Sequence, residues 1–117
     1  FYIMTIQYKN QGFSLTTTNT VSVLTANSTS VVLIKQIQAS NGSSAGALSV
    51  VTQVTDATAA VTYRIGNQSI AASSTTDIIT KTLVLESNDV LKMTCATKDE
   101  IQGIVSYALI NRENQNG

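Results

Sequence analysis

The chain has 117 residues, of which 43% are hydrophobic and only 12% charged, and seven basic side chains balance seven acidic ones. This length provides one domain with one core, and a formal net charge of +0 gives no long-range field to attract a polyanion or an acidic membrane surface. No run approaches the roughly 20 apolar residues of a membrane-spanning helix. We therefore expect one domain that binds neither nucleic acid nor membrane, with a surface of neutral Ser, Thr, Asn and Gln.

The first predicted strand covers residues 2–8, whose alternate side chains form an apolar stripe on one face: Tyr2, Met4, Ile6 and Tyr8. A terminal strand with such a stripe has two alternatives. It completes its own sheet, or it extends as an arm onto a neighbouring subunit. These four residues are the candidate interface.

The remainder of the N-terminal region contains short apolar stretches between turn signals. Asn10-Gln11-Gly12 predicts a turn, and Val21-Ser22-Val23-Leu24 is a short strand candidate. We interpret residues 1–29 as an N-terminal strand or arm followed by a hairpin-rich lead-in.

From residue 30 onward the strand signals become stronger. Val31-Val32-Leu33-Ile34 is apolar on both faces, which favours a central strand. Further strand candidates lie at residues 48–55, 61–65, 90–95 and 105–109, and shorter apolar pieces lie at residues 70–72, 78–79 and 83–85. Turns are predicted at Asp56-Ala57-Thr58 and Gly66-Asn67.

Eight or nine strands at spacings of about 8 to 12 residues, joined by polar turns, predict an all-β fold: an antiparallel β-sandwich, jelly-roll-like or Ig-like. No window keeps an apolar stripe of helical period. Residues 30–110 would form the sandwich core and residues 111–117 a solvated tail, within a single domain overall.

The absence of histidine removes Ser-His-Asp and Cys-His nucleophiles and most zinc ligand sets. Cys95, the only cysteine, excludes an internal disulfide and shares a face with Leu91 and Met93, which predicts a small buried hydrophobe. Lys35 could form a Ser-Lys dyad only if desolvated, and a lysine at a sheet edge usually keeps its head in water.

Two carboxylate pairs have the residue types of a glycosidase site, Glu86 with Asp89 and Asp99 with Glu100. Both pairs fall in predicted turns, where Asp forms local hydrogen bonds and Glu supplies solubility. Three Asn-X-Ser/Thr sequences, at Asn27, Asn41 and Asn67, are interpreted as turn markers in the same way. We predict no enzymatic activity, no metal site and no cofactor.

Three segments resemble small virion structural proteins of tailed bacteriophages, particularly those of marine and cyanobacterial phages: Leu83-Val84-Leu85-Glu86-Ser87-Asn88-Asp89-Val90-Leu91-Lys92, Val105-Ser106-Tyr107-Ala108-Leu109-Ile110 and Ile37-Gln38-Ala39-Ser40-Asn41. The resemblance covers residues 30–110 and leaves residues 1–29 outside it. In that family a glycine commonly precedes the turn aspartate; here Asn88 takes its place, and Asn tolerates the left-handed backbone conformation.

The resemblance implies a β-sandwich in a virion, assembled in the cytoplasm of a bacterial host. Its most direct role would be capsid decoration or cementing, with the major capsid protein or other virion proteins as partners. Repeated weak contacts favour a homo-oligomer, a trimer first among the choices. The alternatives are a neck, tail or fibre component, or a receptor- or glycan-binding module, which requires an exposed Tyr63 or Tyr107 beside polar side chains.

Overall fold

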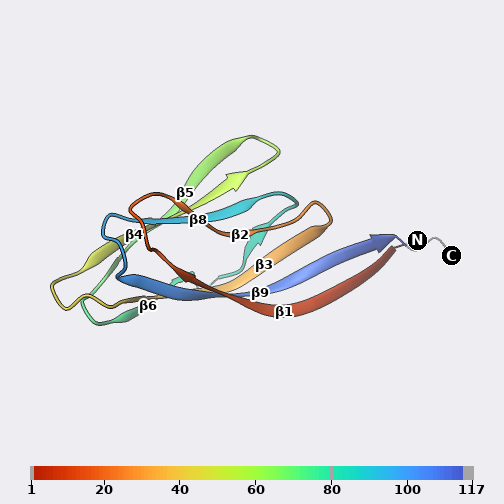
Figure 1. The fold of residues 1–117 in the computed structure, drawn as a ribbon. Coiled ribbons are helices and arrows are strands. Elements are labelled where there is room, and N and C mark those ends of the chain that lie inside the picture. The colour runs from red at the N-terminus through yellow and green to blue at the C-terminus, as the bar shows by residue number, and fades with distance from the viewer. Residues whose placement is uncertain (1, 80, 115–117) are drawn as a thin grey trace.

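The computed structural model describes residues 2–79 and 81–114, and within them it contains nine β-strands arranged in two antiparallel sheets (Figure 1). The predicted all-β antiparallel sandwich is confirmed. No helix of the described part is long and apolar enough to cross a membrane. The strands are β1 (Tyr2–Ser14), β2 (Val21–Thr25), β3 (Ser30–Asn41), β4 (Leu48–Asp56), β5 (Val61–Ile70), β6 (Thr75–Ile79), β7 (Leu83–Leu85), β8 (Val90–Cys95) and β9 (Ile101–Asn114).

The two sheets, here called sheet A and sheet B, face each other as two layers (Figure 1). Sheet A has the order β1-β9-β3-β6, with the short β7 also paired to β3, and sheet B has the order β2-β8-β4-β5. The chain crosses between the sheets at most of its connections, so neighbours in space are mostly distant in sequence. The first and the last strand, β1 and β9, lie side by side.

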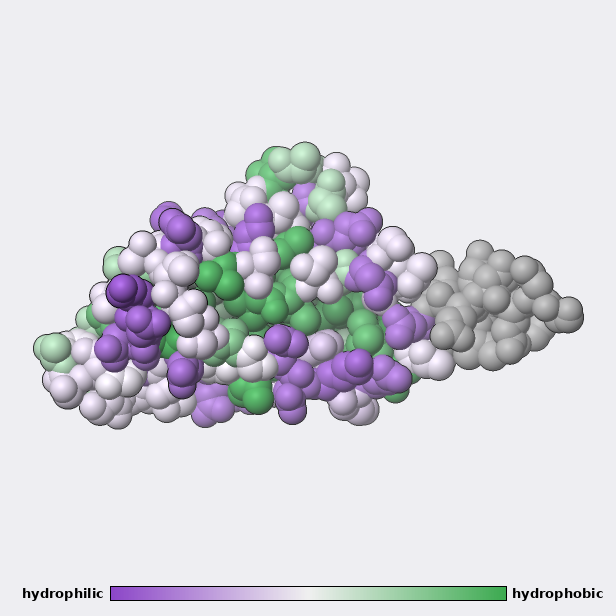
Figure 2. Space-filling model, viewed as in Figure 1, coloured by the Kyte–Doolittle hydropathy of each residue, from purple (hydrophilic) through white to green (hydrophobic). Residues whose placement is uncertain are grey.

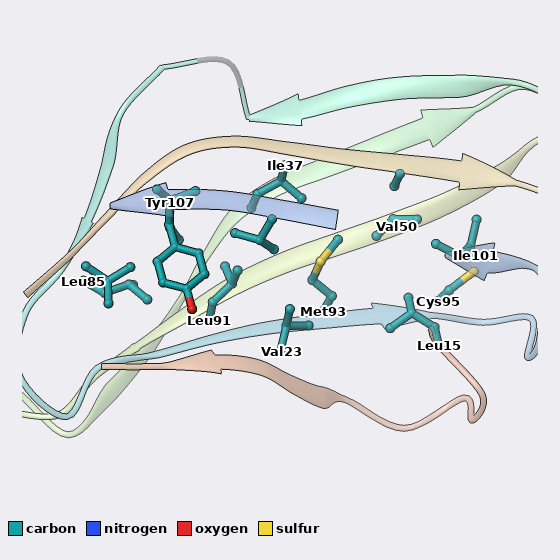
Figure 3. Close-up of a cluster of buried hydrophobic side chains, with 14 of the residues drawn as sticks. Leu15, Val23, Ile37, Val50, Leu85, Leu91, Met93, Cys95, Ile101 and Tyr107 are labelled. Carbon is teal, nitrogen blue, oxygen red and sulfur yellow. The ribbon is translucent and has the colours of Figure 1, made fainter. Parts of the chain in front are cut away.

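The core lies between the sheets and is built by strict alternation. In β8, the side chains of Leu91, Met93 and Cys95 point inward and are buried, while the residues between them are only partly covered. Val32 and Ile34 of β3 meet them from the other sheet. Figure 3 shows inward-facing side chains from both sheets, among them Ile37 of β3 and Leu91 and Met93 of β8, converging on one cluster. The prediction that Cys95 behaves as a buried hydrophobe is confirmed.

The N-terminal region is continuous with this core. Leu15 and Ala26 are fully buried and Val23 nearly so, and all three belong to the same cluster as the residues of β3 and β8. At the other end, β9 runs on through Asn111 to Asn114, so the predicted tail of residues 111–117 starts inside a strand. Residues 115–117 lie outside the described residues.

Two predicted turns are wrong. Asn10-Gln11-Gly12 lies within β1, which pairs with β9 in one uninterrupted register. Gly66-Asn67 lies within β5, beside a register shift between Thr52 and Gln53 of β4. In both places a long neighbouring strand continues past the turn signal, and its ladder of backbone hydrogen bonds outweighs a local preference.

The turn predicted at Asp56-Ala57-Thr58 is confirmed as the connection between β4 and β5. The Asp56 carboxylate accepts hydrogen bonds from the backbone N–H groups of Thr58 at 3.0 Å and Ala59 at 3.1 Å, which closes the turn. Asn88 adopts a φ of 70°, as expected for an asparagine that replaces a turn glycine. Polar and near-neutral residues are spread over the side of the molecule seen in Figure 2, with apolar residues between them.

Candidate interaction surface

β1 completes its own sheet. Its residues pair with β9 from Tyr2 opposite Asn114 to Ser14 opposite Gln102. The pairing of β3 with β9 begins only at Ser30 opposite Asn111, so the far end of β1 and β9 continues as a two-stranded ribbon (Figure 1). Of the two alternatives for the N-terminal stripe, pairing within its own sheet is the one that the strand adopts.

The stripe nevertheless points away from the core. Residues directly opposite each other in a sheet project to the same face, and Ile6 lies opposite Ile110 while Tyr8 lies opposite Ala108. Leu109, between these two β9 residues, packs against the core, and Tyr107, next to Ala108, belongs to it. Ile6 is 60% exposed and Tyr8 82% exposed. The side chains of the other two predicted interface residues, Tyr2 and Met4, lie outside the described residues.

The register extends this outward stripe into two apolar rows across sheet A. The first row joins Ile6 of β1 to Ile110 of β9 and Val31 of β3; the second continues from β1 to β7. We call these seven residues the outer apolar face: Ile6, Ile110, Val31, Tyr8, Ala108, Leu33 and Val84. The alternation of apolar residues in the sequence indicated only the β1 members of this face. The apolar residues at both parities in 105–110 and 31–34 are the sequence signal for the members on β9 and β3.

The outer apolar face has a polar border. The next row along the sheet consists of Asn10, Ser106 and Gln36, and the Gln36 amide donates a hydrogen bond of 2.8 Å to Asp77. Beyond this row the outward side chains stay mostly polar. The face is therefore limited to the half of sheet A nearer the ribbon.

Over residues 6–11 the polarity of β1 is reversed relative to that of a strand that contributes to a core, whereas Phe13 further along the strand does pack against the core. The side chains of this stretch on the sheet B side are Gln7, Lys9 and Gln11, which lie opposite Leu109, Tyr107 and Val105 of β9 and are all exposed. The apolar side chains of this stretch, Ile6 and Tyr8, point outward. Burial in the sandwich core therefore gives no reason for Ile6 and Tyr8 to be apolar.

A second apolar area is a shallow hollow of ≈ 350 Å³ where the β4 and β5 hairpin faces β7. Tyr63, 53% exposed, lies in it beside Asp56 and Glu86, and Val84 connects it to the outer apolar face. Tyr107, the other tyrosine considered for a sugar platform, is only 9% exposed and belongs to the core.

In the candidate carboxylate pair Glu86 and Asp89, the Asp89 side chain binds the backbone of two turns. Asp89 is 7% exposed, and its two oxygens accept hydrogen bonds from the backbone N–H groups of Ala57 at 2.9 Å and Glu86 at 3.0 Å. The backbone of Asp89 also binds Ala26, its carbonyl oxygen accepting from the Ala26 N–H at 3.0 Å. Asp89 thus fastens three connections together, which are the turn after β4, the turn after β7 and the segment after β2.

The second carboxylate pair also lies in a turn. Asp99 is exposed, has a φ of 67° and donates its backbone N–H to the carbonyl oxygen of Leu15 at 2.9 Å. Among the described residues no group of three or more metal-ligating side chains occurs. Lys35 is exposed at a register shift between Ile34 and Gln36 and is not buried as a Ser-Lys dyad requires.

Of the three asparagines in Asn-X-Ser/Thr sequences, Asn41 has a buried side chain, at 1% exposure. Its amide donates to the carbonyl oxygens of Gly46 at 3.1 Å and Ile70 at 3.0 Å and accepts from the N–H of Ser43 at 2.9 Å. It therefore ties the β3–β4 loop to the end of β5. Asn27 and Asn67 are exposed.

No protein-family model matches the chain, and no curated protein matches its sequence. Several solved structures share its fold. A chain of the Bacillus endospore appendages, described as disulfide-linked pili, matches with a TM-score of 0.57 and 7% identity over 97% of this chain and 91% of that chain. A chain of the acid-stable capsid of Helicobacter pylori bacteriophage KHP30 matches with a TM-score of 0.55 and 10% identity over 98% of this chain and 100% of that one.

A chain of the IBDV viral particle matches with a TM-score of 0.52 and 13% identity over 91% of this chain but 31% of that chain. At these identities the likeness establishes a shared β-sandwich fold.

Proposed function

We propose that this protein is a non-enzymatic structural component of a bacteriophage particle, a decoration or cement subunit that binds the capsid lattice through the outer apolar face. Its partners would be the major capsid protein or other virion proteins, and its location the virion, assembled in the cytoplasm of the bacterial host. Neck, tail or fibre attachment through the same face is the alternative position in the particle.

The outer apolar face is the observation that carries the proposal. The outside of a two-layer sandwich is normally solvated and polar, and contiguous apolar patches on a soluble protein mark sites of interaction. Here two apolar rows cross up to four strands and include Ile6 at 60% exposure, Tyr8 at 82% and Val84 at 49%. A flat sheet face of this kind suits contact with another protein surface better than enclosure of a small molecule.

The strand order gives further support. We identify the strand arrangement with a jelly roll rather than an Ig-like sandwich, because the chain crosses between a sheet of order β1-β9-β3-β6 and a sheet of order β2-β8-β4-β5. Jelly rolls are frequent in viral capsids. The KHP30 capsid chain is covered over its whole length, so a capsid structure contains a chain of comparable size and fold. A zero net charge allows many copies to pack without mutual repulsion.

The likeness to the endospore appendages suggests another assembly, a disulfide-linked pilus. Cys95 is the only cysteine of the sequence, and it is buried at 2% exposure among core residues. An intersubunit disulfide through Cys95 would require the sandwich to open. This difference favours the capsid role over a covalently linked fibre.

Quantitative mass spectrometry of purified phage particles tests the proposal. On the order of hundreds of copies per particle would support capsid decoration, because such subunits follow the lattice symmetry. About a dozen copies or fewer would place the protein in the neck, tail or fibre. Complete absence from the particles would overturn the virion role.

A matched pair of double variants tests the surface. Ile6→Ser with Tyr8→Ser removes the β1 members of the outer apolar face, and particles stripped of the protein are expected to lose its rebinding. Val61→Ser with Tyr63→Ser changes an equally spaced apolar pair on β5, exposed at 42% and 53%, and is expected to rebind normally. The reverse result would place the contact on sheet B.

Glycan binding is a second candidate, favoured by the exposure of Tyr63 beside Asp56 and Glu86 in the hollow. Titration of host-surface oligosaccharides into the labelled protein tests it by NMR. Shifts confined to the hollow and lost in Tyr63→Ala would support this function, whereas the absence of any shift at millimolar sugar would reject it.

A further inference from the structure

The four lateral edges of the two sheets differ in how they are protected. An exposed edge strand offers unpaired N–H and C=O groups to any other strand, and natural proteins protect such edges with short strands, bulges, prolines or charges. Sheet A ends in β1 on one side and in β6 and the three-residue β7 on the other, and sheet B ends in β2 and β5. Each edge therefore either carries such a protection or needs a partner.

Three of the edges are protected. β2 and β6 have five residues each, and both have a register shift against their neighbours, between Ser22 and Leu24 for β2 and opposite Ile37 and Gln38 for β6. β5 is longer, with 10 residues, but its ladder with β4 is broken by a shift near Gly66, and it carries Arg64. Bulges and charges of this kind discourage further pairing.

The β1 edge is neither short nor interrupted, and a single charge is its one protection within residues 5–14. β1 has 13 residues in one unbroken register with β9, and the sequence contains no proline. Within residues 5–14 its only charged side chain is Lys9. Residues 5–12 are exposed throughout, and no strand among residues 2–79 and 81–114 pairs with the edge of β1 opposite β9. In an antiparallel strand about every second residue directs its N–H and C=O groups to such a free edge.

We propose that the free edge of β1 binds the same edge of a second copy of this chain, with the two β1 strands antiparallel about a two-fold axis perpendicular to sheet A. The sheet then continues across the dimer as β6-β3-β9-β1 followed by the same four strands of the partner in reverse order. This inference is independent of the virion role, because it concerns the protein in solution. It differs from the trimer that the multivalency argument favours.

A second copy fits this edge for three reasons. A two-fold axis places identical surfaces against each other, so a strand that is compatible with itself closes the assembly at two copies instead of propagating it. β1 satisfies this condition because it is nearly neutral: any register centred away from Lys9 places its ammonium group beside an uncharged residue. Finally, the axis keeps the outward faces of both copies on the same side of the sheet.

The third reason connects the edge to the outer apolar face. Ile6 and Tyr8 are the outermost members of the two rows, directly at the free edge. Pairing of the two β1 strands brings these residues next to those of the partner. Two separate patches thereby become one continuous apolar surface, which a single copy cannot present.

Cysteine scanning provides a direct test. Each residue from 5 to 11 is replaced by cysteine in turn, and since Cys95 is buried, the new thiol is the only accessible one. Opposite residues of antiparallel strands have Cα separations of about 4.5–5.5 Å, within disulfide range. Mild oxidation is expected to give a covalent dimer with a yield that peaks at one position and falls on both sides of it.

Gln68→Cys is the matched control, because Gln68 is exposed on β5, the long edge strand of sheet B. This variant is expected to form no disulfide-linked dimer under the same oxidation. A flat yield across residues 5–11, equal to that of Gln68→Cys, would overturn the proposal.

Sedimentation of the unmodified chain gives the independent measurement. A concentration-dependent monomer–dimer equilibrium is expected, since an edge contact is smaller than the roughly 1,200 Å² of stable interfaces. Gln7→Lys with Gln11→Lys places like charges around Lys9 and is expected to weaken the dimer at least tenfold at low salt, with recovery at 1 M NaCl, where screening is strong. Asn67→Lys with Ser69→Lys on β5 should leave it unchanged. A purely monomeric chain at the highest soluble concentration, or a trimer, would contradict the inference.

Discussion

The ring of Phe13 packs directly against Gly103, its register partner on the neighbouring strand. A methyl group at position 103 would come to 2.5 Å from Phe13 Cζ and would overlap the backbone carbonyl oxygen of Gln38. Gly103 therefore provides the space in which an edge-strand aromatic ring closes the end of the core.

Gly103→Ala is expected to lower the free energy of unfolding by about 3 kcal/mol, because neither the ring nor the β3 backbone can move away without repacking. Gly12→Ala is the control, since the nearest atom to its added methyl group is 3.9 Å away. Its effect should stay within about 0.5 kcal/mol. Urea denaturation measures both variants, and equal losses would show that the close contact at Gly103 relaxes.

Asp89→Asn is expected to destabilise the protein by about 1–3 kcal/mol, because the new amide NH₂ group faces one of the two backbone N–H donors that the carboxylate now satisfies. Asp99→Asn changes an exposed turn carboxylate at a φ of 67°, which asparagine tolerates. Thermal unfolding should show a lower Tm for the first variant and no change for the second. An unchanged Tm for Asp89→Asn would mean that the three connections are held by their backbone bonds alone.

Thr52→Val is expected to raise the free energy of unfolding by about 1 kcal/mol. The Thr52 hydroxyl is fully buried in the core and has no hydrogen-bond partner among the described residues, so valine of nearly the same shape removes an unsatisfied polar atom. Thr62→Val is the control, an exposed β5 threonine whose hydroxyl contacts that of Thr55 at 2.8 Å. Stabilisation by both variants would indicate a general β-propensity effect instead.

Cys95 is expected to resist alkylation in the native protein and to react at the rate of global opening, at least about 10³-fold more slowly than an exposed thiol. Lys98→Cys supplies the exposed thiol in the same molecule. Mass spectrometry of a time course should show one fast and one slow addition. Two fast additions would place Cys95 in a region that opens locally.

The alternation of apolar residues predicted the strand content and much of the core. Leu91, Met93 and Cys95 are buried as their common parity indicates. The residues apolar at both parities, such as Val32 and Leu33, were correctly placed in a central strand, but only one parity faces the core. The other parity forms part of the outer apolar face, a distinction that requires knowledge of what covers each side of the sheet.

The turn signals were less dependable because they are local. Asn88 behaves as predicted, since it adopts the left-handed backbone conformation that asparagine tolerates in turns. Gly12 and Gly66 are drawn into strands by the partners beside them. Local preferences of a few tenths of a kcal/mol are smaller than the sum of the ladder hydrogen bonds that those partners supply.

The sequence predicted only part of the outer apolar face. Period-two alternation showed that Ile6 and Tyr8 share a face, but the direction of that face depends on the pairing with Ile110 and Ala108, about 100 residues away in the chain. The extension to Val31 and Val84 depends on two further registers. Register between distant strands is set by the whole fold and not by any local pattern.

The pairing of the first strand with the last also sets the order of events during synthesis. β1 is synthesised before β9 and has no partner in sheet A until β9 has been made, so sheet A is completed only when the sequence through Asn114 is available. The surfaces formed by β1 and β9 are therefore absent from every shorter nascent chain. A copy that stops before β9 therefore has neither the outer apolar face nor the completed sheet A, and both surfaces appear only after β9 has folded onto β1.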